Sequence, residues 1–570
     1  MNWPERLAKD VSNEMGLSEE GVLEEIRKMR SRAGDLFPFK ENGNPSYRKH
    51  QERLIVESAI ALWIQGYDNV VIDGPTGIGK SAVNYTLGRM ANDSFYTTPQ
   101  KSLRNQLQDD DALSLGMKTL RARQDYICGA TNKDCSSCPI NQSDDKSCKD
   151  QPDCTYWNNK VNTMDEQIAA ITFAYLIVDD YIPTTSGDEQ VSFGDRELLI
   201  VDECHTLESQ VASLFAGFTL SPWSVPVDVY GNSHKKIKRI ENNIDDHNDF
   251  RGILSEVAER AERFVQVHEG EEEKSNELDQ CESFLRKYNY FKEEIDEGRS
   301  WVADVGEVGH PEHSGDVKSL EAKPVRVDRF LDRFVWSRGD KRILSTATMP
   351  YRENPEEWFR RLGLPGKTKV IKAPMPFPRE NRPVMTDTEI ASFSSGGDDE
   401  NWHYIVDSIR EIANENSGEK GLIHTASYSR AERLVESLPS GMAMADEKGV
   451  DSTDMIEKWQ NSDYQILCSP SMMEGVDLKY DLCRWQVLLK VPYPNSHADS
   501  RVAYLLNEKS EWDWYFQETG LQIWQSIGRA VRAEDDSATY YVLDQSFEDI
   551  VKKTTPPKWV LEGLGAGKSA

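Results

Sequence analysis

Long hydrophobic runs and an excess of basic residues are both missing from this sequence. No stretch approaches the roughly 18 consecutive apolar residues that a membrane-spanning helix needs. The first residues, MNWPERLAKDVSNEMG, mix charges and lack the apolar core of a signal peptide. We therefore expect a soluble, cytoplasmic protein without a membrane segment, and in that compartment its cysteines stay reduced.

Positive charge is scarce, because 67 lysines and arginines stand against 97 aspartates and glutamates, for a formal net charge of −30 at pH 7. This is the reverse of the basic surface common in nucleic-acid-binding proteins. The acidic residues are spread along the whole chain rather than collected in a tail. Their distribution favours a well-solvated acidic surface, as on halophilic proteins, over a surface for one highly charged partner.

The chain alternates short apolar runs with helix-like stretches, which is the pattern of α/β domains with parallel sheets. Its 570 residues exceed what one hydrophobic core accommodates. Polar segment 108–165 and charged, helix-prone segment 210–335 interrupt the alternation. The predicted buried strands are 70–72, 198–201, 342–344, 421–423, 465–468, 486–489 and 540–543.

A phosphate-binding loop follows the first of these strands. Its sequence, GPTGIGKS, precedes a helix-like stretch, so both neighbouring elements that the motif requires are present. The glycines let backbone amides converge on phosphates, Lys80 supplies a positive charge, and the Ser81 hydroxyl can bind Mg²⁺. The predicted nucleotide-binding residues of the loop are Gly74, Thr76, Gly77, Gly79, Lys80 and Ser81.

The C-terminal stretch GLGAGKSA also ends in Gly-Lys-Ser, but it does not fit the same motif. Glu562 occupies the position of the first glycine, and two prolines precede the stretch instead of a strand. We expect residues 556–570 to be a disordered tail.

A second strand, ELLIV, ends in Asp202-Glu203-Cys204-His205. Adjacent acids at the end of a buried strand are costly unless they serve a cation. Beside a phosphate loop, this pattern predicts that Asp202 binds Mg²⁺ and that Glu203 is the base for the attacking water.

Asp-Glu-x-His after a phosphate loop is motif II of the superfamily 2 helicases, and further motifs follow it in order. TTPQKSLRNQ at 97–106 resembles motif Ia, LSTATMP at 344–350 motif III, and GLIHTASYSRAERL at 421–434 motif IV. SPSMMEGVDLKYDLCRWQVLLKVPYPN is similar to motif V, and QSIGRAVR at 525–532 to motif VI. The chain thus resembles the XPD/DinG family of iron–sulfur DNA helicases, with a halophilic archaeon or its mobile element as the expected source.

The resemblance implies roles for further residues. Gln51, with Arg48, is similar to the family's motif at the adenine side or entry of the nucleotide site, and Glu474, Gly475 and Asp477 match the core of motif V. Gln525, Arg529 and Arg532 match motif VI; on a helix, the two arginines would share a face and reach the γ-phosphate. The chain departs from the family at Phe173, where the family usually has Asn, and at 544–546, where Asp-Gln-Ser replaces Asp-x-Arg.

The family fold consists of two RecA-like α/β domains, each with a parallel sheet, that bind ATP between them. The first would carry a small iron–sulfur insert and a helical arch insert. The implied parts are a helical extension at 1–44, domain 1 at 45–375 with inserts at 108–165 and 210–335, domain 2 at 376–555, and the tail at 556–570.

Five of the nine cysteines lie in the first insert. Disulfides are disfavoured in a reducing compartment, and five thiols cannot pair completely. Cys135-x-x-Cys138 has the spacing of a structural zinc site, but the insert contains no second such pair. Four thiolates can instead hold a [4Fe–4S] cluster, and the resemblance implies a cluster domain at this place.

The resemblance also indicates the ligands of that cluster. Cys128, in DYIC, and Cys154, in CTYW, are the anchors. Cys148 follows from its spacing to Cys154, and Cys138, which precedes a proline, is preferred over Cys135. The choice between these last two, and between iron–sulfur and zinc, stays open.

The resulting hypothesis is an ATP- and Mg²⁺-dependent helicase that loads on single-stranded or forked DNA and moves 5′ to 3′ as a monomer. The alternative is a DNA-stimulated ATPase that remodels nucleoprotein without unwinding and carries a structural zinc. A fused nuclease is not expected, because the 44 residues before the motor are too few for such a domain.

Overall fold

The structure is a computed structural model. It describes residues 2–99, 113, 115–128, 134–135, 154–181, 184–186, 189–241, 249–271, 275–309, 316–386, 401–472, 478, 480–529 and 531–567.

Domain 1 is built on a seven-stranded parallel sheet in the order β14-β3-β13-β9-β4-β6-β5. Strand β3 is buried along its whole length because the neighbouring strands and helices cover it. The strands are β3 (Asn69–Asp73), β4 (Ser94–Thr98), β5 (Met117–Thr119), β6 (Ile168–Thr172), β9 (Arg196–Asp202), β13 (Gly339–Thr346) and β14 (Thr368–Lys372).

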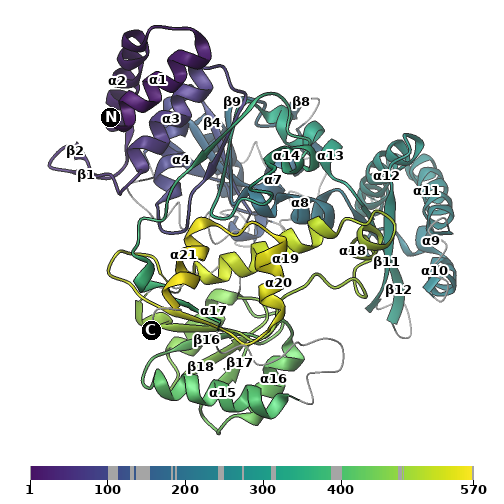
Figure 1. Ribbon diagram of the computed structural model, residues 1–570. Helices are drawn as coiled ribbons and strands as arrows, with labels where there is room; N and C mark the ends of the chain where they lie inside the picture. The colour runs from purple at the N-terminus through teal and green to yellow at the C-terminus, as the bar shows by residue number, and fades with distance from the viewer. Residues whose placement is uncertain are drawn as a thin grey trace.

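The N-terminal helices α1 (Trp3–Met15) and α2 (Glu19–Leu36) belong to this domain's packing. Asn2 and Ser18 cap their first turns, and Val11 and Ile26 join the core cluster that includes Leu54. Leu54 lies on α3 (Gln51–Trp63), which packs beside α4 (Lys80–Met90). The first 36 residues therefore cover domain 1 rather than extending from it (Figure 1).

Domain 2 is a six-stranded parallel sheet in the order β15-β20-β19-β16-β18-β17. Figure 1 shows it below domain 1, with α19 and α21 along the side that faces domain 1. Its strands are β15 (Val384–Met385), β16 (Gly421–His424), β17 (Ala443–Ala445), β18 (Ile466–Ser469), β19 (Trp485–Leu488) and β20 (Thr539–Val542). Its helices are α15 (Trp402–Glu415), α16 (Tyr428–Ser437), α17 (Ser452–Gln460), α18 (Ser500–Asn507), α19 (Trp512–Ile527), α20 (Ser546–Lys553) and α21 (Lys558–Gly567).

The two parallel sheets confirm the predicted fold class. Each of the seven predicted strands overlaps an observed strand, and five of them agree with it within one residue at either end. Strands β9 and β13 are longer than predicted, because they begin two and three residues earlier, and β13 also ends two residues later. The expectation of a disordered tail is wrong, because residues 558–567 form helix α21, with Trp559 and Val560 buried against domain 2. Apolar residues at 559, 560 and 564 lie on one face of this helix, so tertiary packing stabilises it despite its glycines.

The insert module, residues 218–325, contains more than the helices that the sequence indicates. Helices α9 (Val227–Tyr230), α10 (Ser233–Glu241), α11 (Asp249–His268) and α12 (Ser275–Asp296) pack with strands β10 (Phe218–Leu220), β11 (Trp301–Gly309) and β12 (Asp316–Pro324). These strands form an antiparallel sheet in the order β10-β12-β11. Valines recur every third residue in β11, not every second, so its sequence lacks the usual strand signal.

None of the described helices combines the length and the apolar character that crossing a bilayer requires.

Candidate functional site

The phosphate loop lies at the carboxyl end of β3, where β9 and β13 also end. Their parallel register places Asp73 beside Thr346 and Asp202 beside Ser345. Gly77 and Gly79 have φ of 81° and 80°, a conformation that favours glycine. A Cβ on Gly79 would lie 2.4 Å from Gln51 Nε2, so the loop also requires glycine there for space.

Gln51 supports this loop from its outer side. Its Nε2 donates to the carbonyl oxygens of Ile78 and Gly79, each at 3.1 Å, and its Oε1 accepts from the Arg48 amide at 2.7 Å. The Arg48 guanidinium donates to Gly77 O at 3.3 Å. Both residues of the predicted adenine-side motif therefore contact the loop backbone.

Lys80 begins α4 and points between the loop and motif II. Its Nζ donates to Gly74 O at 3.3 Å and lies 3.7 Å from a carboxylate oxygen of Glu203. The loop and motif II are thus joined by a charged pair, Lys80 and Glu203, at the edge of the sheet.

Asp202 is held by two hydroxyl groups. Its Oδ1 accepts from Ser345 Oγ at 2.7 Å and its Oδ2 accepts from Tyr96 OH at 2.8 Å. Ser345 Oγ in turn accepts from Asn84 Nδ2 at 2.8 Å. Burial, with the charge of Glu203 next to it, raises the pKa of Asp202. Ser345 and Tyr96 therefore orient the carboxylate of Asp202, and a cation near it would lower its pKa again.

Sequence reasoning missed Tyr96 and Asn84 as supports of the site. The signal was available in part, since a tyrosine in the middle of the short strand SFYTT must satisfy its hydroxyl group when buried. Tyr96 is 0% exposed and Asn84 is 0% exposed, and both bond toward Asp202.

Glu203 has a left-handed backbone with φ of 50°, which a non-glycine residue adopts at a cost. Burial alone would raise the pKa of Glu203, but Lys80, His205, Arg529 and Arg532 together lower it. Its carboxylate is therefore ionised at neutral pH, as the base for a water molecule must be.

His205 connects motif II with domain 2. Its Nδ1 lies 3.0 Å from Thr346 Oγ1, and its Nε2 is in hydrogen-bond contact with Gln525 Nε2. Gln525 Nε2 also lies 3.1 Å from Thr348 Oγ1, so motifs II, III and VI meet in one buried polar contact.

Domain 2 also touches the phosphate loop. Thr76 Oγ1 donates to Gly528 O at 2.8 Å, and a Cβ on Gly77 would lie 3.2 Å from Arg532 O. Arg529 and Arg532 are near enough to Glu203 to lower its pKa. The predicted motor residues of both domains are therefore brought together.

The predicted helical placement of Arg529 and Arg532 is wrong. Helix α19 ends at Ile527, where Gly528 is the C-terminal cap and its amide donates to Trp524 O and Gln525 O. The arginines follow in non-helical backbone, so they do not share a helix face. Their position beside Glu203 comes from the contact between the domains.

The core of motif V and the second part of motif Ia are not among the residues that the structure describes. Glu474, Gly475 and Asp477 lie outside the described residues, as do residues 100–106. The strand that leads to motif V, β18, ends at Ser469, whose hydroxyl donates to Asp446 at 2.6 Å.

Of the predicted cluster ligands, Cys128 and Cys154 are described and buried, whereas Cys138 and Cys148 lie outside the described residues. Thr155 Oγ1 donates to Ile127 O at 2.7 Å, and Ile127 pairs with Asp134. The chain beside Cys128, Cys135 and Cys154 is therefore hydrogen-bonded together, and all three side chains are buried. Within the described ranges, no set of three or more His, Cys, Asp or Glu side chains is arranged to hold a metal ion.

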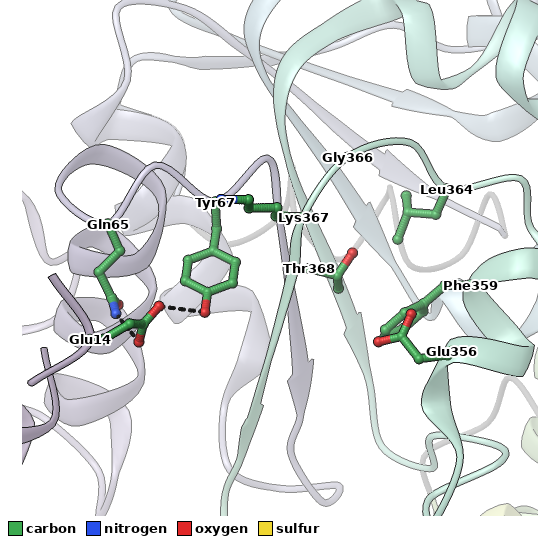
Figure 2. A pocket seen from close by; sticks show the side chains of 9 residues that line it. All are labelled: Glu14, Gln65, Tyr67, Glu356, Phe359, Leu364, Gly366, Lys367 and Thr368. Carbon is green, nitrogen blue, oxygen red and sulfur yellow. Dashed lines mark hydrogen bonds between the residues drawn. The ribbon is translucent and has the colours of Figure 1, made fainter.

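A cavity of about 450 Å³ lies elsewhere on domain 1 (Figure 2). In it, Glu14 accepts hydrogen bonds from Tyr67 OH and Gln65 Nε2, each at 2.7 Å. Tyr67 precedes β3 and Lys367 precedes β14, so the cavity is at the amino ends of these strands. The phosphate loop follows the carboxyl end of β3, and the cavity is therefore separate from the nucleotide site.

Comparisons with known proteins agree with this architecture. Residues 409–562 match the family model described as helicase C-terminal domain. Two solved structures share the fold. S. tokodaii Xpd4 matches with a TM-score of 0.52 and 17% identity, over 89% of this chain and 99% of that chain. An XPD helicase matches with a TM-score of 0.57 and 16% identity, over 89% of this chain and 98% of that chain.

A curated relative matches over a shorter region. A segment of 104 residues is 28% identical to the ATP-dependent DNA helicase CHL1 of Vanderwaltozyma polyspora. This segment is 16% of the present chain and 12% of the CHL1 chain.

Proposed function

We propose that this chain, which has the fold of the XPD/DinG-type superfamily 2 helicases and a helicase C-terminal domain at residues 409–562, is an ATP-dependent DNA helicase. The contact of His205 with Gln525 carries the proposal. It joins the segment after the predicted catalytic base to the segment before the predicted arginine fingers, so chemistry at the nucleotide is linked to the relation between the two domains.

In the proposed reaction, the phosphates of ATP bind the amides of the loop from Gly74 to Gly79. Lys80 exchanges its contact with Glu203 for the outer phosphates. Mg²⁺ held by Ser81 and Asp202 would neutralise charge that develops on the phosphates. Asp202 is prepared for this because Ser345 and Tyr96 fix both of its oxygens.

Glu203 then accepts a proton from the attacking water, while Arg529 and Arg532 stabilise negative charge on the transferred phosphoryl group. Loss of the γ-phosphate removes the anion between these arginines and domain 1. The attraction that keeps the cleft closed falls, and the domains separate. Repetition of this cycle moves a DNA strand bound across both domains.

For DNA, we infer that single strands and forks are loaded and that movement runs 5′ to 3′ by a monomer. Gln51 and motif V, with Glu474, Gly475 and Asp477, complete the nucleotide site and its link to DNA. An acidic protein gains little from phosphate contacts at high salt, so stacking on bases, worth about 1–3 kcal/mol each, contributes more of the affinity.

For the cysteine segment, we propose a [4Fe–4S] cluster held by Cys128, Cys138, Cys148 and Cys154. A cluster there would staple a small segment that has little core of its own. The buried positions of Cys128 and Cys154 beside hydrogen-bonded backbone support thiolate ligation at this place.

The activity is tested with Lys80→Ala and, as a matched control, Lys28→Ala, which changes a lysine with a 60% exposed side chain. Loss of one charge that contacts the phosphates should lower DNA-stimulated ATPase by about 10²–10³-fold. The control should hydrolyse ATP and unwind 5′-tailed duplexes at the wild-type rate. ATPase retained in Lys80→Ala would contradict the proposal, and ATPase without strand displacement would favour nucleoprotein remodelling.

The metal is tested by anaerobic purification with iron and sulfide analysis. We expect about four irons per chain and a broad visible absorbance that Cys154→Ser abolishes. Stoichiometric zinc without sulfide would contradict the cluster.

A further inference from the structure

Among the described residues, domain 2 contacts the rest of the chain at the nucleotide cleft and at the base of the insert module, and the chemistry of these two contacts differs. At the nucleotide cleft, the contacts are hydrogen bonds between polar groups, such as Thr76 to Gly528 O and Gln525 to Thr348. At the base of the insert module, the contact has an apolar core. That core consists of Val302 and Val325 from the module side and Val502, Leu505, Leu506 and Trp514 from domain 2.

Charged groups surround this apolar core on the module side. Lys323 of β12 is buried and lies 2.5 Å from Asp304 of β11 and 3.1 Å from Asp499, which caps α18. Asp304 also accepts from the Ser500 amide at 2.9 Å. Figure 1 shows α18 between the end of α19 and β11 of the insert module.

Domain 1 joins the same contact through Glu208, which lies on α8 (Leu207–Gln210) six residues after Asp202. Arg361 of α14 (Pro355–Arg361) donates to both of its carboxylate oxygens, at 2.7 and 3.0 Å. Arg501 of α18 donates to Glu208 Oε1 at 2.6 Å and to Val325 O at 3.0 Å. One guanidinium of domain 2 therefore binds domain 1 and the insert module together.

Burial alone would raise the pKa of Glu208, but Arg361 and Arg501 lower it to about 2. The carboxylate is therefore charged at any pH at which the protein works, and it needs its arginine partners. Arg501 is equally buried, with 7% of its side chain exposed, so withdrawing it from Glu208 would leave a desolvated charge without its partner.

The two contacts thus respond differently to opening of the cleft. When the cleft opens, the polar groups at the nucleotide side can replace their hydrogen bonds to one another by hydrogen bonds to ATP or water, at little cost in free energy. At the module side, separation would expose an apolar core and divide a buried ion pair. We propose that the contact of β11, Val325 and Glu208 with α18 is a pivot that stays closed while the nucleotide cleft opens and closes around it.

The pivot rests on the proposed motor function and deepens it. In this arrangement Glu208 and Arg501 are positioning residues, because they hold domain 2 against the segment that carries Asp202 and Glu203 without touching the nucleotide. The insert module consequently keeps a constant position relative to α18 during each ATP cycle.

Hydrogen exchange of the full-length wild-type protein tests the pivot. Peptides covering β11 and α18 are followed without nucleotide, with a non-hydrolysable ATP analogue, and with analogue plus forked DNA. We expect the exchange rates of their amides to be the same in all three states, while peptides at 74–81 and 523–529 change with nucleotide. Faster exchange of β11 or α18 in one of these states than in the others would overturn the pivot.

This result can be separated from failure of the proposed function. A protein that shows no nucleotide effect at 74–81 would contradict the ATPase. The exchange of β11 and α18 with and without forked DNA would still decide the contact, because unchanged exchange supports it and faster exchange in either state refutes it without reference to catalysis.

Variants give a second measurement. Arg501→Gln should lower strand displacement per ATP hydrolysed at least tenfold, and Arg501→Lys, which keeps the charge but not the forked donor, should recover part of it. Arg410→Gln, which removes an arginine with a 50% exposed side chain in the same domain, should have no effect. Unchanged coupling in a folded Arg501→Gln protein would contradict the positioning role, and the wild-type exchange rates decide the proposal if that variant does not fold.

Discussion

The C-terminal helix α21 provides the sharpest test of how the fold supports the nucleotide site. Trp559 is 5% exposed and packs in the core that contains Trp524 and Ile527 of α19. A Cβ on Gly528 would lie 3.4 Å from its ring. Gly528 O accepts the hydrogen bond from Thr76 of the phosphate loop, so Trp559 lies directly behind a contact between the domains.

The expected cost of Trp559→Ala follows from this burial. An aromatic side chain buries about 150–250 Å², which at about 25 cal/mol per Å² corresponds to roughly 4–6 kcal/mol as an upper value. Trp559 Nε1 is buried and finds no acceptor among the residues that the structure describes, and removing such a donor returns about 1–3 kcal/mol. We expect a net loss of about 2–4 kcal/mol in the free energy of unfolding.

Thermal unfolding and ATPase kinetics measure the two consequences. For a domain of this size, the loss corresponds to a fall of roughly 4–16 °C in Tm. If the Thr76 to Gly528 hydrogen bond loosens as well, kcat/KM for ATP should fall by about 2- to 12-fold, the equivalent of one hydrogen bond.

Trp512→Ala is the matched control, because Trp512 is 50% exposed on α19 of the same domain. It should change Tm by less than about 2 °C. The reasoning would be refuted if Trp559→Ala behaved like this control, since α21 would then contribute neither to the core of domain 2 nor to motif VI.

Two further changes test the polar contacts. Gln525→Ala removes the hydrogen-bond partner of the buried His205 Nε2, at a cost of about 1–3 kcal/mol, so DNA-stimulated kcat should fall by about 5- to 150-fold. Gln545→Ala, at an exposed position, should not change kcat. Equal rates for these two variants would show that the contact between motifs II and VI is not needed for hydrolysis. His424 provides a test by pH. Burial, together with the charge of Arg529, lowers the pKa of His424 from 6.5 to about 4. As pH drops from about 6.5 toward 4, the unfolded chain therefore binds the proton before the folded chain does, and the free energy of unfolding falls. Between pH 7 and pH 5 this loss is about 2 kcal/mol in urea unfolding, and His424→Asn should remove it while His403→Asn, at an exposed position, should not.

The local features of the nucleotide site could be predicted because neighbours in sequence decide them. GPTGIGKS requires glycines with positive φ between a strand and a helix, and it occupies that place after β3. Asp202 ends strand β9 after the apolar run at 198–201 and Glu203 follows it, and parallel pairing brings such strand ends to one edge of the sheet. The parallel sheets follow from the same alternation of apolar runs and helices.

Contacts between distant segments could not be predicted from residue patterns. Nothing in SFYTT indicates that Tyr96 bonds to Asp202, because that contact depends on the order of strands β9 and β4. The arginines of motif VI were expected on a helix, yet Gly528 ends α19 one residue before Arg529. Their role beside Glu203 depends on domain 2 docking, which no local periodicity encodes.

The cysteine segment likewise has features that the sequence predicts and a contact that only the folded chain shows. The sequence predicted thiol ligands at Cys128 and Cys154, and it preferred Cys138 to Cys135 from the proline that follows. The structure adds that Cys135 is buried and that its amide donates to Tyr126 O at 2.9 Å, two residues before Cys128. Spacing along the chain cannot indicate such proximity, because it depends on the antiparallel pairing of Ile127 with Asp134.

Residue order alone therefore established the class of fold, the phosphate loop, the motif II carboxylates and the sequence of helicase motifs, since each depends on short-range backbone geometry and side-chain chemistry. Three features required the folded chain: the support of Asp202 by Tyr96 and Ser345, the buried helix α21, and the joining of domain 1, the insert module and α18 at Glu208. Each of these unites residues tens to hundreds of positions apart. Their free energy comes from excluding water around packed side chains and paired charges, which exists only once the distant segments have met.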